Sequence, residues 1–234
     1  MDTNRERPTI SVAMPAFNEE AQIEASVEAI VAHLVASGET WELVVIDDGS
    51  RDATASRVEA IAARDGRVHL VRHGRNQGVG QAIATGFQAS RGDWFMVIPA
   101  DLAMDLRDID RFLGARHGVA VVAGYTSSRA DYSAWRGLVS WANRHAVALL
   151  AGVRVRNPNY IHLFRHDALR GDPFRFTGSA ALYAEMLRRA QARGPVVEVP
   201  IRYVPRVSGV QTGARWSLVA RTARDLLRVR LGLP

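Results

Sequence analysis

The residues best suited to chemistry follow three apolar segments in the first half of the chain. They are residues 15–19 (PAFNE), residues 47–50 (DDGS) and Asp101. Carboxylates accept hydrogen bonds from the N–H groups of a base and from the hydroxyls of a ribose. If the first two groups open at one edge of a sheet, they could read a nucleoside. Asp101, on a short loop after its strand, is placed to meet a metal ion or a sugar hydroxyl.

Simpler roles exist for the same residues. The DDGS segment could be a turn that also caps the next helix. Asp101 could be the N-cap of a helix that begins near Leu106. Taken one at a time, the residues leave both alternatives open.

A glycine-rich stretch at 76–82 (NQGVGQA) precedes the third predicted helix. Two glycines before a helix allow backbone amides to approach a phosphate, so Gly78 is a candidate ligand. The stretch lacks the third glycine of the dinucleotide-binding fingerprint and the lysine of a P-loop. It could equally be a plain loop that starts a helix.

A possible phosphate clamp lies further along the chain. Arg136 and Ser140 are one helical turn apart, and Arg129 lies in the loop before them. Arginine grips phosphate in a bidentate way and stays charged at working pH. The alternative is a solvated helix face. The histidines lack metal-ligand spacing, and we expect structural roles for them.

The elements that must position these residues alternate regularly at first. We expect strands at 9–14, 41–46, 68–72 and 94–98, and helices from Asn18 as N-cap to Gly38, from 52 to 64 and from about 80 to 92. Strands 119–123, 160–164 and 196–204 (interrupted by Pro200) and helices 134–151, 178–193 and 215–231 follow. This is a doubly wound α/β pattern, in which ligands bind outside the carboxyl ends of the strands.

The composition narrows the function classes. The 234 residues contain no cysteine, which excludes disulfides and cysteine nucleophiles, and the net charge of +6 comes from arginine without lysine. A basic excess favours phosphate-bearing partners. No segment approaches the roughly 20 apolar residues of a membrane span. We expect one domain over 1–214, with halves at about 8–105 and 106–214, and a basic amphipathic helix over 215–234.

Four segments, in order, resemble family 2 glycosyltransferases of the GT-A fold. They are PAFNEE at 15–20, VVIDDGSRDAT at 44–54, NQGVGQAIATGFQASRGDW at 76–94 and PADLAMD at 99–105. In the second half, HLFR at 162–165 and VEVPIRYVPRVSG at 197–209 are similar to segments of polyprenyl-phosphate sugar transferases, such as dolichol-phosphate mannose synthases. The fold that the resemblance implies is one mostly parallel, Rossmann-like sheet flanked by helices.

The resemblance also implies an activity and a set of site residues. The activity is inverting transfer of a hexose from GDP-mannose or a UDP-sugar to a polyprenyl phosphate, without nucleic acid. We expect a cytoplasmic protein whose basic C-terminal helix makes peripheral contact with the anionic inner face of the plasma membrane. The alternative is a helix that packs on the domain by its apolar face. The expected nucleotide-binding residues are Pro15, Ala16, Asn18, Glu19, Asp47, Asp48 and Gly78. The expected acceptor-binding residues are Arg136, Ser140 and Arg206. Asp101 and Arg129 are the expected catalytic residues.

Asp101 is also the expected ligand of Mg²⁺ or Mn²⁺. The family's D-x-D motif has Pro99 in place of its first acid here, so we expect weaker metal affinity. Two alternatives remain open. The acceptor could be a soluble hydroxyl compound, which would require a carboxylate base such as Glu185. The chain could also be a non-catalytic relative that binds nucleotide.

Overall fold

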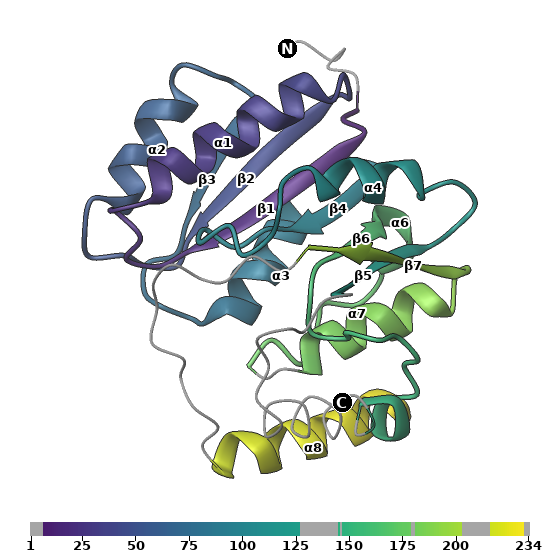
Figure 1. Ribbon diagram of the computed structural model, residues 1–234. Helices are drawn as coiled ribbons and strands as arrows, with labels where there is room; N and C mark the ends of the chain where they lie inside the picture. Colours follow the sequence, from purple (N-terminus) through teal and green to yellow (C-terminus); the bar gives the residue numbers. More distant parts are fainter. Residues whose placement is uncertain (1–6, 127–144, 146, 179–180, 203–215, 232–234) are drawn as a thin grey trace.

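A seven-stranded sheet forms the centre of the molecule (Figure 1). The computed structural model describes residues 7–126, 145, 147–178, 181–202 and 216–231, and in its last helix it describes the side chains of 222 and 224–231. The strands are β1 (Ile10–Ala16), β2 (Trp41–Asp47), β3 (Val68–Arg72), β4 (Trp94–Val97), β5 (Val121–Thr126), β6 (His162–Arg165) and β7 (Val196–Ile201). The helices are α1 (Ile23–Ala36), α2 (Thr54–Ala62), α3 (Val79–Ala89), α4 (Asp108–Gly114), α6 (His166–Leu169), α7 (Ala181–Gln191) and α8 (Trp216–Leu231).

The strand order β3-β2-β1-β4-β6-β5-β7 confirms the predicted fold. Every strand pair is parallel except those of β6, which runs antiparallel to both β4 and β5. The order reverses at β1, where β2 lies on one side and β4 on the other. In register, Ala16 pairs with Asp47. The carboxyl ends of β1, β2 and β4 therefore open at one edge, where an α/β sheet binds its ligand.

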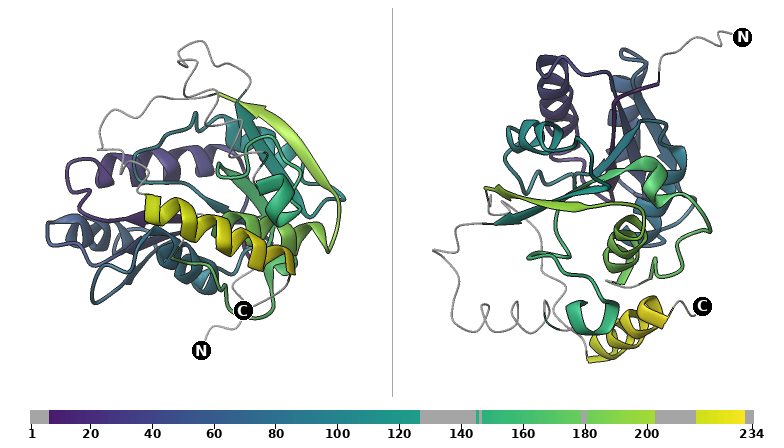
Figure 2. Two further views of the ribbon diagram at one scale, coloured as in Figure 1. Left: turned by 90° about the horizontal axis from the view of Figure 1, so that it is seen from below. Right: turned by 90° about the vertical axis from the view of Figure 1, so that its right-hand side faces the viewer.

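Apolar side chains cover both faces of the sheet. Helices α1, α2 and α4 lie on one face, α3 and α7 lie on the other, and α8 forms an outer layer beyond α7 (Figures 1 and 2). Ile23, Val27 and Ile30 of α1 belong to the first core. Burying such a side chain contributes about 1.5–3 kcal/mol. In the second core, a Cβ on Gly86 of α3 would lie 2.8 Å from the Ala13 side chain, so glycine lets α3 approach the sheet closely.

The first helix begins later than predicted. Asn18 is not its N-cap, because α1 starts at Ile23 and Asn18 has a φ of 55°. The side chain of Asn18 accepts a hydrogen bond from the backbone N–H of Arg51 instead. Residues 17–22 therefore link two loops at the ligand edge. The predicted end of this helix is confirmed, since Gly38 has a φ of 72° just beyond it.

Pro15 and Pro200 lie within strands without interrupting them. The Ala13 carbonyl accepts from Ile98 on the β4 side, and the Ala16 carbonyl accepts from Asp48 on the β2 side. Because backbone groups alternate sides along a strand, Pro15 faces the β4 side, beyond the last paired residue of β4. β7 likewise runs through Pro200, since it is an edge strand that pairs only with β5. An edge strand needs no N–H on its open side.

The last helix packs on the domain by part of its surface. Leu226 and Val229 of α8 are buried in the second core, whereas Leu227 and Leu231 are exposed. Of the helices in the described part, none is long and apolar enough to cross a membrane. The division into 1–214 and 215–234 remains a prediction. Of the predicted helix 134–151, residues 145 and 147–151 are helical, and the others lie outside the described residues.

Candidate active site

Asp48 supports the glycine-rich loop from within the protein. The residue is 3% exposed. Its Oδ1 accepts a hydrogen bond from the backbone N–H of Gln77 at 2.9 Å, and its Oδ2 accepts from that of Gly78 at 2.8 Å. Gly78 itself has a φ of 91°, a conformation that favours glycine. The carboxylate predicted to read a nucleoside thus also fixes the backbone at the start of α3.

His73 completes this support. Its Nδ1 lies 2.7 Å from Oδ1 of Asp48, and its Nε2 lies 2.9 Å from Oγ1 of Thr85 in α3. Because a carboxylate only accepts, Nδ1 carries a proton and donates to Asp48, while Nε2 lies within hydrogen-bond distance of the threonine hydroxyl. A buried imidazole therefore ties the ends of β2 and β3 to α3. The sequence predicts a structural role for this histidine. It does not predict the contact with Asp48, because the two residues are 25 positions apart.

Asp47 lines a pocket of about 510 Å³ at the ligand edge. Its buried carboxylate accepts from the backbone N–H of Ser50 at 3.1 Å. Phe17, which is 40% exposed, forms another part of the wall. Three arginines also line the pocket, namely Arg51, Arg72 and Arg75. An aromatic ring, an acid and several guanidinium groups together suit a base, a ribose and a diphosphate.

The loops after β1 and β2 are joined by hydrogen bonds. The backbone N–H of Asn18 donates to Oγ of Ser50 at 2.9 Å, and that of Glu19 donates to Oγ1 of Thr54 at 2.8 Å. The Glu19 carboxylate accepts from the side chain of Gln22. Pro15 and Ala16, the other residues expected here, form the end of β1. Most predicted nucleotide-binding residues thus lie in one connected structure.

Asp101 lies half-buried at the carboxyl end of β4. Its Oδ1 accepts from the backbone N–H of Ala103 at 3.3 Å, and the next residue, Leu102, has a φ of 46°. Ser26 of α1 donates to the carbonyl of Ala100 at 2.6 Å. The alternative in which Asp101 caps a helix is wrong, since the N-cap of α4 is Arg107 and no side chain caps it. The loop is instead a tight turn braced against α1.

The donor set of this loop fits a divalent ion only in a limited way. In the described part of the chain, no group of three or more histidines and acids could enclose a metal. Asp105 is engaged, since it pairs with Arg107 at 2.6 Å and Arg202 at 3.6 Å. The hydrogen bonds from Arg107 lower the pKa of Asp105 to about 2. Mg²⁺ can nevertheless be held by one carboxylate together with substrate phosphates and water.

Several predicted residues cannot be located in the same way. Arg129, Arg136, Ser140 and Arg206 lie outside the described residues. Glu185, the candidate base, is buried, and its carboxylate accepts from the N–H groups of Arg175 and Phe176. It also pairs with the guanidinium of Arg189 at 2.5 Å. Glu185, a residue of α7, therefore has a structural role, since it binds the segment that precedes this helix.

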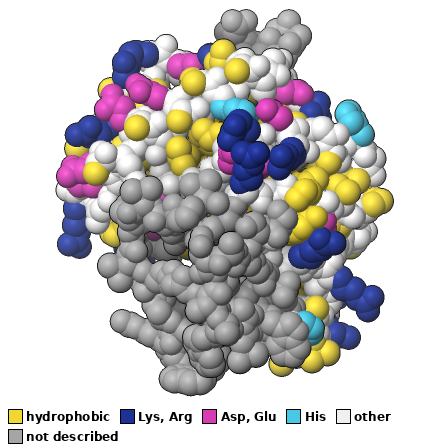
Figure 3. All heavy atoms as spheres, viewed as in Figure 1, with side chains coloured by type: hydrophobic (Ala, Val, Ile, Leu, Met, Phe, Trp, Pro, Cys, Tyr) yellow, Lys and Arg dark blue, Asp and Glu magenta, His cyan; other side chains and the backbone are white. Residues whose placement is uncertain are grey.

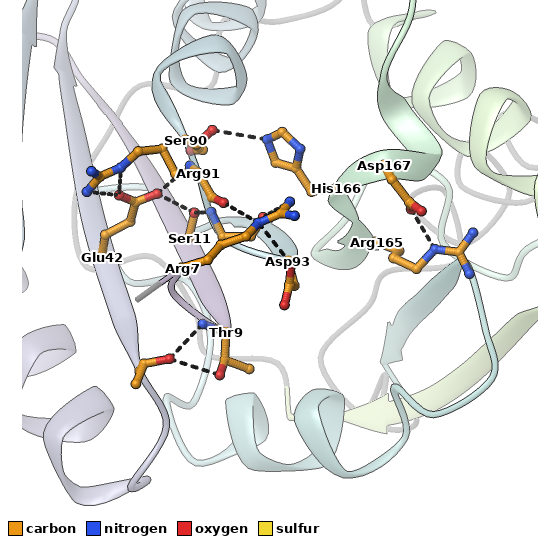
Figure 4. Close-up of polar contacts among 12 residues, drawn as sticks. Arg7, Thr9, Ser11, Glu42, Ser90, Arg91, Asp93, Arg165, His166 and Asp167 are labelled. Carbon is orange, nitrogen blue, oxygen red and sulfur yellow. Dashed lines mark hydrogen bonds and ion pairs between the residues drawn. The ribbon is translucent and has the colours of Figure 1, made fainter. Parts of the chain in front are cut away.

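The opposite edge of the sheet contains a second polar cluster (Figure 4). Glu42 is buried and accepts from Oγ of Ser11 at 2.6 Å and from Nη2 of Arg91 at 2.9 Å. The hydroxyl of Ser11 also accepts from the N–H of Gly92 at 2.7 Å. Burial would raise the pKa of Glu42, but these hydrogen bonds outweigh it and hold the pKa below its ordinary value. The cluster joins β1, β2 and the start of β4.

The sequence model of one family spans most of this structure. The model, described as Glycosyl transferase family 2, matches residues 11–189, which include both the pocket of Asp47 and the loop of Asp101. The chain belongs to glycosyl transferase family 2. The resemblance predicted from four short segments is thereby confirmed for this family 2 chain.

Curated relatives of this family 2 chain include enzymes named for polyprenyl phosphates. An undecaprenyl-phosphate 4-deoxy-4-formamido-L-arabinose transferase of Pseudomonas aeruginosa is 37% identical over 150 residues, which are 63% of this chain and 44% of the relative. A dodecaprenyl-phosphate galacturonate synthase of Rhizobium johnstonii is 29% identical over 151 residues, 63% of this chain and 45% of the relative. The chain thus matches less than half the length of each relative.

Solved structures share the fold of this family 2 chain. Glucosyl-3-phosphoglycerate synthase from Mycobacterium tuberculosis, in complex with Mn²⁺, UDP and glucosyl-3-phosphoglycerate, superposes with a TM-score of 0.69 at 23% identity, covering 97% of this chain and 81% of that one. A mannosyltransferase from Pyrobaculum calidifontis with GDP-mannose and Mn²⁺ has a TM-score of 0.61 at 20% identity, covering 86% and 58%. At these identities the likeness shows the fold alone, and it confirms the predicted GT-A architecture.

Proposed function

We propose that this chain transfers a sugar from a nucleotide diphosphate sugar to a polyprenyl phosphate, with inversion at the anomeric carbon. The observation that supports the proposal is that a pocket and an acidic loop lie on either side of the end of β1. The pocket of Asp47 opens beside β2, and the braced loop of Asp101 follows β4. A donor lying across the end of β1 would meet both.

In this proposal the donor's nucleoside occupies the pocket beside Phe17. Asp47 and Glu19 accept hydrogen bonds from its base and ribose, and Asp48 keeps the loop of Gly78 in place. The backbone of Pro15 and Ala16 and the side chain of Asn18 form the adjoining wall. GDP-mannose and UDP-sugars remain the two donor classes, since the solved neighbours hold UDP in one case and GDP-mannose in the other.

Asp101 would hold a divalent ion, Mg²⁺ or Mn²⁺, on the donor diphosphate. When bound, such an ion offsets the negative charge that grows on the leaving nucleoside diphosphate. With Pro99 in place of an acid, a single carboxylate holds it, so the affinity is modest and rises with bound donor. The backbone N–H of Ala103, which donates to Oδ1 of Asp101, would help to orient the carboxylate.

The acceptor would be positioned by Arg129, Arg136, Ser140 and Arg206. A phosphate oxygen of the acceptor attacks the anomeric carbon while the bond to the donor diphosphate breaks, which inverts the configuration. A phosphate is already anionic, so it needs no general base. This agrees with the structural role of Glu185, and it favours a lipid phosphate over a hydroxyl acceptor.

A polyprenyl phosphate resides in a bilayer, so the chain would work at the cytoplasmic face of the plasma membrane. The basic helix α8, with Leu227 and Leu231 exposed, is our candidate for peripheral contact with anionic lipid. Among the described side chains of this helix, Leu226 and Val229 are buried in the second core and hold it to the domain. The contact proposed is therefore that of a docked helix and not of a free tail.

The test is transfer of radiolabelled sugar from GDP-mannose and from UDP-sugars to undecaprenyl phosphate in detergent, followed by extraction with organic solvent. We expect label in the organic phase with one donor class. Label that stays in a new water-soluble product would contradict the lipid acceptor. Nucleotide binding without any transfer would indicate the non-catalytic alternative.

A further inference from the structure

A hollow lined by arginines lies far from the donor pocket. It has a volume of about 460 Å³ and lies between the segment 170–176 that follows α6, helix α7 with the residues just after it, and α8. The carboxyl end of α7 leads into the start of β7, at the edge of the sheet opposite to Asp47 and Asp101. The arginines among its lining residues are Arg170, Arg175, Arg188, Arg189, Arg193 and Arg228.

Only two of these arginines are neutralised by acids of the hollow. Glu185 pairs with Arg189, and Asp172 pairs with Arg175. The lining contains six arginines against these two acids, which leaves an excess of four positive charges. Within the described residues, no ion pair joins an acid to any of the other four arginines. They are Arg170, Arg188, Arg193 and Arg228.

Backbone carbonyls orient two of the four guanidinium groups. Arg188 donates to the carbonyl of Ala151 at 3.2 Å and to that of Arg230 at 2.8 Å. Arg193 donates from Nη1 to the carbonyls of Asp167 at 2.7 Å and Arg170 at 2.6 Å. Carbonyls fix the position of a guanidinium group without cancelling its charge. The remaining N–H groups are thus preorganised for an anion.

The positive charge of Arg170 is felt by a neighbouring residue. His166, the first residue of α6, is buried, and its pKa is lowered by burial and by the charge of Arg170. Over α1, α2 and α4, by contrast, arginines and acids alternate on the surface (Figure 3). A solvated charged face of the ordinary kind has this mixed character, and the hollow does not.

We propose that the hollow binds a phosphate group, carried either by a soluble phosphate compound or by the headgroup of an anionic lipid. The lipid source has support from nearby apolar side chains. Leu149 and Leu231 are 70% and 65% exposed, and a guanidinium nitrogen of Arg230 donates to the carbonyl of Leu149. This site is independent of the proposed transfer reaction, because none of its residues lines the donor pocket.

The test compares the full chain with the double variant Arg170→Gln/Arg228→Gln. Neither side chain has a hydrogen-bond or ion-pair partner among the described residues, so the fold should be kept. The matched control is Arg57→Gln/Arg64→Gln, in α2 and just beyond its end, which removes the same charge from exposed positions. Binding is measured by thermal shift with inorganic phosphate against chloride at equal ionic strength. It is also measured by sedimentation with phosphatidylcholine vesicles that contain or lack phosphatidylglycerol.

We expect one of the two probes to bind, with a dissociation constant raised about tenfold in Arg170→Gln/Arg228→Gln and unchanged in the control. Loss of a saturable phosphate shift would identify a soluble ligand. Loss of phosphatidylglycerol-dependent sedimentation would identify a lipid headgroup. If the double variant behaves as the control with both probes, the proposal is wrong. A thermal shift with UDP or GDP should be equal in all three proteins, so failure of the donor site would be seen separately.

Discussion

Nδ1 of His73 lies 2.7 Å from Oδ1 of Asp48, beneath the loop that leads into α3. The same carboxylate accepts from the backbone N–H groups of Gln77 and Gly78. The DDGS motif thus divides its two acids between two roles. Asp47 lines the pocket, whereas Asp48 supports the backbone of Gln77 and Gly78, which directly follows the pocket residue Asn76. The proposed donor site depends on this support.

Asp48→Asn should therefore destabilise the protein and weaken donor binding together. An amide offers one oxygen and turns an NH₂ group toward donors, so one of the three hydrogen bonds is lost. We expect the free energy of unfolding to fall by about 1–3 kcal/mol, measured by urea denaturation. The thermal shift with nucleoside diphosphate should shrink in parallel. The control is Asp93→Asn, at an exposed ion pair with Arg7, which should change neither quantity appreciably.

His73→Phe tests the same support from the other side. The phenyl ring is somewhat larger than the imidazole and makes neither hydrogen bond, so Asp48 loses a donor and Thr85 loses its partner on the ring. We expect a higher KM for the nucleotide sugar and a smaller change in kcat, because the residue acts through the loop. An unchanged KM in a folded variant would contradict the positioning role.

A glycine series tests how closely the loops approach each other. Gly49 has a φ of 75°, and a Cβ there would lie 2.5 Å from the backbone carbon of Arg75. Gly38 has a similar φ with open space around it, and Gly114 has open space without a positive φ. Strain from the φ alone costs about 1–2 kcal/mol. The loss of unfolding free energy should rank Gly49→Ala above Gly38→Ala, with Gly114→Ala near zero.

The Gly49→Ala protein should also lose donor affinity, since its clash lies in the wall of the donor pocket. Gly38→Ala changes a helix end far from that wall and should bind nucleotide normally. Equal stability losses for Gly49→Ala and Gly38→Ala would show that the backbone of Arg75 can move aside at little cost.

The buried cluster at the other edge predicts an acid-sensitive stability. The pKa of Glu42 is lower in the folded state than its ordinary value of 4.5. The stability that follows from this shift is fully present above the unfolded pKa, and it is lost as the pH falls through the folded pKa. Glu42→Gln should cost about 1–3 kcal/mol at neutral pH. The difference from the unsubstituted protein should shrink below about pH 4.5.

Urea denaturation at several pH values measures this difference. Glu24→Gln is the control, because Glu24 is exposed and its pairing with Arg57 at 3.4 Å should contribute little. A stability difference for Glu42→Gln that stays constant from neutral to acidic pH would contradict the proposed linkage.

The sequence was most informative where local pattern and structure coincide. Nearly all-apolar runs such as 41–46, in which Glu42 is the one charged residue, predict parallel strands buried on both faces, and β2 is such a strand. The acids that follow these runs lie at the ligand edge because the strands are parallel and adjacent. The motif order therefore predicted the fold, and it predicted that these acids lie at one edge of the sheet.

Features that depend on contacts between distant segments could not be predicted in this way. Asparagine is a common N-cap residue, but Asn18 instead forms hydrogen bonds with Ser50 and Arg51 of the next loop. Pro200 interrupts a strand in the sequence pattern, and only its edge position makes it harmless. The arginine hollow combines residues from 170 to 228 that share no motif.

The measurement that tests the central claim most directly is a thermal-shift titration with UDP, GDP and their sugar conjugates, with and without Mg²⁺ or Mn²⁺. A ligand at about one hundred times its dissociation constant adds about 2.7 kcal/mol of stability, which is a shift of several degrees for a chain of this size. We predict a shift with one base that metal enhances, and an Asp101→Asn protein that keeps the shift but loses the enhancement. No shift with any nucleotide, in protein that is folded, would contradict the proposed transferase.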